Sequence, residues 1–195
     1  SLLQLYGCAG LVYHRDILKT NDGNYIIVKG FSEIEGGKTV IKLRSNMIEE
    51  WQWQIEQVDN YQMMNISKEQ GEILNLLETK DGSFVGVGRK KSESKSRAGN
   101  LTTTSTFYNP LIFKLDSSGE KSWGVVHKNN GWLYNVVQIS DRDFIACGAI
   151  IRGYKRGVIP QENGLLIRFN QSGKILWSKE SGYRTRRPPS RTSPS

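Results

Sequence analysis

The sequence contains little cysteine, histidine and proline, and it has no long apolar run. Among its 195 residues are two Cys, two His and five Pro, beside twenty Gly. Cys8 and Cys147 are too few and too far apart for a disulfide framework or a metal-binding spacing, which leaves the redox compartment open. Cys147 lies in an apolar run and is predicted to be a small buried strand residue. The apolar runs are far shorter than the roughly 18 residues of a membrane-spanning helix, so the sequence predicts none.

Sequence motifs of catalysis are also missing. The chain has no Gly-x-Ser-x-Gly, no phosphate-binding Walker loop and no His-Glu-x-x-His. His14 and His127 are isolated and favour surface polar roles. Asp141 and Asp143 supply two carboxylates, whereas a calcium site needs three or more converging oxygens. We therefore predict no catalytic, cofactor-binding or metal-binding residue in this chain.

One sequence pattern recurs three times, in residues 16–30, 72–88 and 133–148. Each copy has an apolar-rich run, a tight turn, an aromatic residue and a glycine. Asp-Gly between two apolar runs is a strong hairpin signal, because glycine adopts a positive φ without steric cost. The turns begin 59 and then 60 residues apart. Each turn and the aromatic residue that follows it are Asp22-Gly23 with Tyr25, Asp81-Gly82 with Phe84, and Asp141-Arg142-Asp143 with Phe144.

A second pattern follows each first one, in residues 40–51, 111–123 and 165–177. A basic residue stands nine positions before a tryptophan, in the pairs Lys42 and Trp51, Lys114 and Trp123, and Arg168 and Trp177. The turn between them contains Asp116 and Gly119 in the second copy and Gly173 in the third, and residues 44–47 are its degraded counterpart. We predict four short strands per unit, in units near 16–71, 72–132 and 133–182, with the tryptophans packed between neighbouring units.

Repeated units of four antiparallel strands are typical of a β-propeller. The stretches Thr20-Asn21-Asp22-Gly23-Asn24-Tyr25-Ile26, Leu111-Ile112-Phe113-Lys114-Leu115-Asp116 with Gly119 and Trp123, and Trp177-Ser178-Lys179 also resemble a repeat of secreted and surface bacterial proteins, similar to pyrroloquinoline-quinone-type propeller blades. The expected fold is all-β, with about three four-stranded antiparallel blades over residues 1–182. Because propellers typically need four to eight blades, we expect a partial ring: either a fragment of a longer propeller, or a homo-oligomer whose copies close the ring.

The first ten residues have two interpretations. In the favoured one, Tyr6-Gly7-Cys8 is the Tyr-Gly-Gly strand ending of the family, with Cys8 in place of the second glycine. In the other, Leu5-Tyr6-Gly7-Cys8 is a lipobox and Cys8 carries a lipid anchor, although no Lys or Arg precedes it. Both interpretations predict an exported protein, extracellular, on the cell surface or in the periplasm.

The net charge of +8 is concentrated in two segments, while the rest of the chain is close to neutral. One is an insertion in the second unit, residues 89–109, with Arg89, Lys90, Lys91, Lys95 and Arg97; the other is the tail, residues 183–195, which has four Arg. This distribution argues against nucleic-acid binding, which needs basic residues grouped on one face. We expect both segments to be disordered, with contact to a partner or an anionic surface as the alternative for the insertion.

The sequence thus favours a non-catalytic binding or scaffold propeller, associated with the cell envelope and acting through protein–protein or surface contacts with an unknown partner. The alternative is a fragment of a propeller enzyme, quinone-dependent or glycan-active, whose catalytic residues lie outside this chain. Fold alone does not choose between them.

Overall fold

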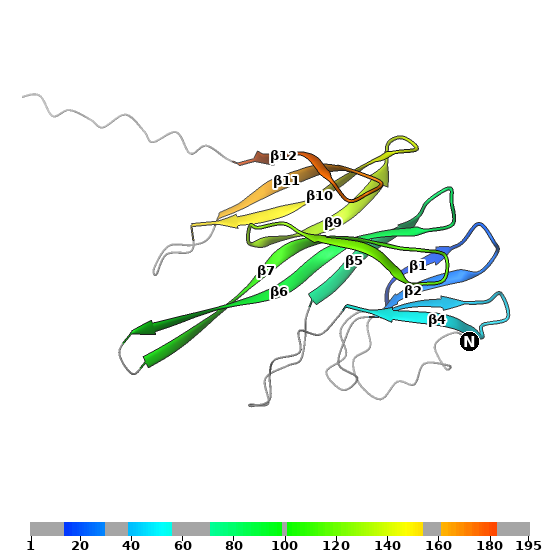
Figure 1. The fold of residues 1–195 in the computed structure, drawn as a ribbon, viewed down its shortest axis with the longest axis horizontal. Helices are drawn as coiled ribbons and strands as arrows, with labels where there is room; N and C mark the ends of the chain where they lie inside the picture. Colours follow the sequence, from blue (N-terminus) through cyan, green and yellow to red (C-terminus); the bar gives the residue numbers. More distant parts are fainter. Residues whose placement is uncertain (1–13, 30–38, 56–70, 99–100, 154–160, 183–195) are drawn as a thin grey trace, which may run out of the picture.

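The computed structural model describes residues 14–29, 39–55, 71–98, 101–153 and 161–182. Within these ranges the chain forms strands and turns, without a helix, in three four-stranded antiparallel sheets (Figure 1). The described part of the chain has accordingly no helix long and apolar enough to cross a membrane. The strands are β1 (His14–Lys19), β2 (Tyr25–Lys29), β3 (Thr39–Leu43), β4 (Glu49–Gln54), β5 (Gly71–Glu78), β6 (Phe84–Ala98), β7 (Leu101–Leu115), β8 (Lys121–Val126), β9 (Gly131–Gln138), β10 (Asp143–Arg152), β11 (Gln161–Asn170) and β12 (Ile175–Ser181).

Each sheet consists of four strands that are consecutive in the sequence. The orders are β1-β2-β3-β4, β5-β6-β7-β8 and β9-β10-β11-β12, and every neighbouring pair is antiparallel. The three sheets follow one another and pack face to face, with the sheet β5–β8 in the middle (Figure 1). The prediction of an all-β chain built from three four-stranded antiparallel sheets is therefore confirmed.

The middle sheet is buried on both faces, because successive residues of a strand point to opposite sides. One face packs against the first sheet and the other against the third, in two separate apolar clusters. The first cluster joins Ile26, Val28 and Val40 of the first sheet to Ile73, Leu76, Phe84, Leu111, Phe113 and Leu115. The second cluster joins Val85, Val87 and Ile112 to Leu133, Val136, Phe144, Ala146, Ile150, Leu165, Ile167 and Phe169 of the third sheet.

A tryptophan closes the rim of each junction between two sheets. The Trp51 indole N–H donates to the carbonyl of Ser117 at 3.1 Å, and its ring covers Gly119 in the turn between β7 and β8. The Trp123 indole N–H donates in the same way to the carbonyl of Gln171 at 2.9 Å, and its ring covers Gly173. We call this arrangement the rim contact: the tryptophan of one sheet lies on the glycine turn of the next.

The rim contact requires glycine for two physical reasons. Gly119 and Gly173 have positive φ values of 86° and 79°. A Cβ atom added to Gly119 would also lie 2.5 Å from the Trp51 ring, and one added to Gly173 would lie 2.8 Å from the Trp123 ring. Any side chain there would strain the turn and displace the tryptophan.

Replacing Gly119 by alanine is predicted to destabilise the protein more than the same change at Gly82. Gly82 has a similar φ of 75°, but an added Cβ would meet no atom within 4 Å. Gly82→Ala therefore introduces only the backbone strain, about 1 kcal/mol, whereas Gly119→Ala also displaces Trp51. We expect Gly119→Ala to cost at least about 1 kcal/mol more, since it also disturbs the packing of the Trp51 ring on the turn. Urea denaturation of both variants checks this prediction. Equal losses in the free energy of unfolding would show that Trp51 moves aside without loss of stability.

Candidate functional site

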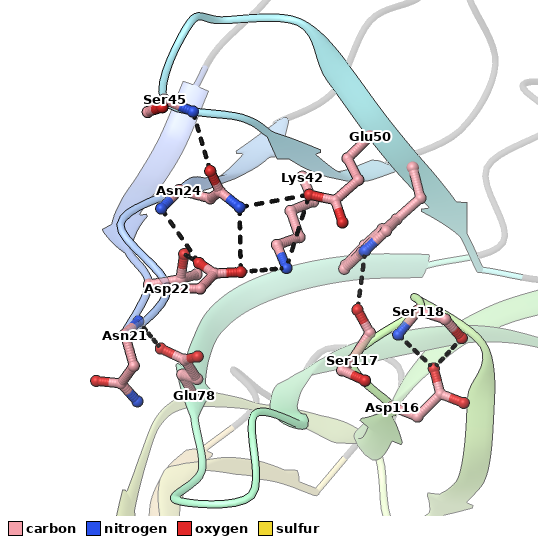
Figure 2. Close-up of polar contacts among 12 residues, drawn as sticks. Asn21, Asp22, Asn24, Lys42, Ser45, Glu50, Glu78, Asp116, Ser117 and Ser118 are labelled. Atoms are coloured by element: carbon pink, nitrogen blue, oxygen red, sulfur yellow. Dashed lines mark hydrogen bonds and ion pairs between the residues drawn. The ribbon is translucent and has the colours of Figure 1, made fainter.

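The turn between β1 and β2 is held by a buried lysine (Figure 2). The Lys42 ammonium donates to the Asp22 carboxylate at 2.8 Å, and the Lys42 side chain is almost fully buried. The same carboxylate accepts from the Thr20 hydroxyl and from the Asn24 backbone N–H. The hydrogen bond from Lys42 is the largest of the contributions that hold the pKa of Asp22 far below its ordinary value.

The second sheet repeats this arrangement and the third changes it. Lys114 donates to Asp81 at 3.1 Å, and the Thr79 hydroxyl, followed by Lys114, holds the pKa of Asp81 low. In the third sheet Arg168 pairs with Asp143. Asp141, at the sequence position of Asp22 and Asp81, instead pairs across the junction with Lys80 at 2.6 Å.

Polar contacts also link the turns of neighbouring sheets. The backbone N–H of Asn21 donates to the Glu78 carboxylate at 2.7 Å, across the first junction (Figure 2). The ion pair between Lys80 and Asp141 occupies the corresponding place in the second junction, where it raises the pKa of Lys80 and lowers that of Asp141. In the turn after β7, a hydrogen bond from the Ser118 hydroxyl is the largest cause that lowers the pKa of Asp116. These acidic residues stabilise turns and junctions.

The basic insertion forms a β-hairpin, which corrects the expectation of a disordered loop. β6 and β7 pair in continuous register from Phe84↔Leu115 to Ala98↔Leu101. The physical reason is a run of threonines and aromatics in residues 102–108, which have high strand propensity and pair with the polar run that precedes them. We call residues 91–108 the arm, and it extends well beyond the three sheets (Figure 1).

The base of the arm is anchored by Arg89. Its guanidinium pairs with Glu72 at 2.5 Å, and the Glu72 side chain is only 3% exposed. The same guanidinium lies 4.4 Å from the centre of the Tyr108 ring and 5.9 Å from that of the Trp132 ring. Arg89, predicted as a partner contact, thus has a structural role at the junction of the second and third sheets.

The segment that connects β8 to β9 fastens the arm to the third sheet. The buried Asn109 side chain donates to the carbonyl of Asn129 at 3.0 Å, and the Tyr108 N–H donates to the Asn130 side chain at 3.1 Å. Asn130 also accepts the backbone N–H of Ile151 in the third sheet at 2.8 Å. His127 lies in this segment, and burial lowers its pKa. The root of the arm is consequently held on both sides.

The remaining predicted residues have several locations. Phe84 and Phe144 are fully buried beside the junctions, and Tyr25 is partly buried in the first sheet. Gly23 has a positive φ of 82° in its turn. Lys90 lies on β6 directly before the arm, and Lys91, Lys95 and Arg97 lie on β6 within it. Cys8 and the tail, residues 183–195, lie outside the described residues.

Cys147 is exposed, which corrects the prediction that it is buried. It lies on the face of the third sheet that points away from the middle sheet, so no neighbouring sheet covers it in the described part of the chain. Sequence reasoning also missed Glu72 and Trp132 at the base of the arm. The available signal was a buried-type strand, Gly71–Glu78, with a carboxylate in an apolar context, which needs a cation as partner.

The charged side chains described above pair with one another within and between the sheets. Within the described ranges, no three His, Cys, Asp or Glu side chains gather closely enough to hold a metal ion. No known family model matches the chain, and no curated protein matches it either.

Replacing Asp22 or Asp81 by asparagine is predicted to reduce stability at neutral pH and to flatten its acid dependence. Folding lowers both pKa values, so the carboxylates stabilise the fold above the ordinary aspartate pKa of about 4, and this contribution is lost as the pH falls below it. Each carboxylate is about half exposed and screened by water, so we expect a loss of about 1 kcal/mol at pH 7.

The matched control for these variants is Asp116→Asn. Asn170 occupies the equivalent turn position in the third sheet and accepts the same kind of bonds, from Ser172 and Lys174. We expect this variant to stay close to wild type in denaturation at pH 7. A steep acid transition that persists in the Asp22→Asn and Asp81→Asn variants would contradict the assignment.

Replacing Arg89 by methionine is predicted to cost about 3 kcal/mol, because it removes the guanidinium that pairs with the buried Glu72 carboxylate. The double variant Glu72→Met with Arg89→Met is expected to recover most of this loss, since two apolar side chains replace the ion pair. A double-mutant cycle by urea denaturation measures the coupling. Additive losses would mean that the pair does not act as a unit.

Proposed function

We propose that the protein is a non-catalytic binding or scaffold β-propeller that acts through protein–protein or surface contacts. The propeller assignment is supported by three successive four-stranded sheets packed face to face, as blades around a common axis require. Their first strands lie next to one another, β1 against β5 and β5 against β9. The Asn75 side chain links these strands, donating to Asp16 at 3.4 Å and accepting from the Val136 N–H at 3.3 Å.

The arm is the observation that carries the binding proposal. Beyond Lys90, β6 pairs only with β7 in the described part of the chain, so the arm projects as a two-stranded ribbon. An isolated hairpin of this kind is marginally stable in water. Here its root is fixed by Arg89, Asn109 and the segment before β9. A ribbon held rigidly at its root and extended beyond the sheets suits contact with another molecule.

The chemistry of the arm favours a partner with negative charge and with backbone groups to pair. Residues 102–106 are exposed threonines and a serine on β7. The opposite strand brings Lys95 into register with Thr104 and Arg97 into register with Thr102. Basic residues attract acidic surfaces, and the strand edges of the ribbon offer hydrogen bonds to an added strand. We therefore assign the partner contact to the arm beyond Lys90, with Arg89 as its anchor.

An exported, envelope-associated location remains part of the proposal. It rests on the resemblance of the repeated blocks to secreted and surface bacterial proteins. Lipidation of Cys8 belongs to the alternative interpretation of the first ten residues, and mass spectrometry of the mature protein would test it by the mass of the added lipid.

Photocrosslinking from the arm tests the proposal directly. A photoreactive amino acid at Thr104 is expected to yield a discrete crosslinked product in cells, whereas the same group at Ser122, an exposed position on β8, is expected to yield none. The competing variant replaces residues 94–105 by Asn-Gly, a two-residue turn that joins the paired positions Glu93 and Thr106. This shortened protein, added in excess, should fail to compete with the Thr104 product, and effective competition would refute the role of the arm.

A further inference from the structure

The third sheet exposes an apolar face that its two predecessors bury. This face, which points away from the middle sheet, contains Val137, Ile145, Cys147, Leu166 and Trp177, in register across the four strands. Val137 is 51% exposed, Leu166 is 43% exposed, and Cys147 is exposed as well. We call these five residues the open face.

Three residues of the open face, Ile145, Cys147 and Leu166, have buried equivalents in both other sheets. Cys147 corresponds to Val28 and Val87, which are 1% and 0% exposed. Leu166 corresponds to Val40 and Ile112, and Ile145 to Ile26 and Val85, all of them buried under the next sheet. The same strand positions therefore form a docking surface twice within this chain.

Trp177 occupies the strand position of Trp51 and Trp123, the two tryptophans that form rim contacts. Trp51 and Trp123 each donate their indole N–H to the turn of the following sheet and cover its glycine. Trp177 pairs with Arg168 across the strands, as Trp51 does with Lys42 and Trp123 with Lys114. In place of a glycine turn, the Lys179 ammonium lies 5.3 Å from its ring centre.

The first sheet of a second copy does not fit the open face. Its turn carries Met47, with φ of 67°, where the other sheets have Gly119 and Gly173. A side chain at this position occupies the space of the tryptophan ring, as the Cβ distances at Gly119 and Gly173 show. The Met47 side chain packs against Ile27, Ile41 and Leu43, on the face of the first sheet that points away from the middle sheet. Those three residues are already buried, while Ile17 at the edge of the same face is exposed.

We propose that the open face binds a further four-stranded unit of this repeat, one whose turn carries the sequence Asp or Asn, any residue, Ser, Gly. The indole of Trp177 donates to the carbonyl of the second turn residue and covers the glycine. An apolar face like that formed by Phe113, Leu115 and Phe84 covers Ile145, Cys147 and Leu166. The proposal rests on the propeller assignment and is independent of the role of the arm.

Thiol reactivity of Cys147 tests the proposal in the full-length protein. Cys8→Ser leaves Cys147 as the reporter, and a second copy of residues 127–182 is inserted after Gly182, with Cys147→Val in the inserted copy alone. Ellman's reagent measures the rate of modification. We expect the inserted unit to slow the reaction at least about tenfold, which corresponds to a docked state favoured by about ten to one.

The matched control carries Gly173→Met in the inserted copy only. The first sheet accommodates Met47 at the equivalent turn position, so this change is compatible with a folded unit. We expect it to restore rapid modification of Cys147. When Trp177 of the original third sheet is replaced by alanine, the inserted units with Gly173 and with Gly173→Met should protect Cys147 to the same small extent.

Three results would overturn the proposal. In the first, the inserted unit fails to protect Cys147. In the second, the inserted unit with Gly173→Met protects Cys147 as well as the inserted unit that keeps Gly173. In the third, the Cys8→Ser protein without an insertion becomes protected as its concentration rises, which would show that a second copy docks. Failure of the arm experiment leaves this test unaffected, because the arm contributes no residue to the open face.

Discussion

A sheet of four short strands has two faces and cannot cover either of them itself. In this chain the apolar face of one sheet is covered by the face of the next sheet of the same kind. The middle sheet shows the complete arrangement, with one apolar cluster on each side. At the rim, the large tryptophan ring needs a flat partner, and a glycine turn with positive φ supplies it. The repeat in the sequence is the consequence of this packing requirement.

A buried cation connects the packed faces to the turns. Lys42 and Lys114 lie on the faces that bury apolar residues, and their ammonium groups reach the carboxylates of the first turn in each unit. Because a buried ammonium needs a partner, the turn and the strands are stabilised together. The third sheet uses the longer Arg168 with Asp143, which leaves Asp141 to pair with Lys80 of the middle sheet. The third unit thus departs from the pattern at both Arg168 and Asp143, and it gains a contact between sheets.

Local signals in the sequence were sufficient to predict the all-β class and the four-stranded units. Asp-Gly turns, aromatic residues at fixed positions and tryptophans at a fixed spacing are short-range features, and each unit repeats them. The arm was expected to be disordered because its composition is polar and basic. The strand propensity of residues 102–108 is a local signal for the hairpin. The contacts that hold its base, from Arg89 to Glu72 and from Asn109 to Asn129, are long-range and no local pattern reveals them. The exposure of Cys147 escaped prediction for the same reason, since a strand residue is buried only where another sheet covers it.

Hydrogen exchange of the backbone amides, resolved by residue, measures most directly whether face-to-face covering stabilises the sheets. Val85, Val87 and Ile112 of the middle sheet have Ile145, Cys147 and Leu166 as their equivalents in the third sheet. The two sets occupy the same positions in their strand ladders, but another sheet covers only the first set. We expect the amides of the middle sheet to exchange more slowly, because opening them requires two packed faces to separate. Equal or faster exchange in the middle sheet would contradict the dependence of the fold on the covered faces.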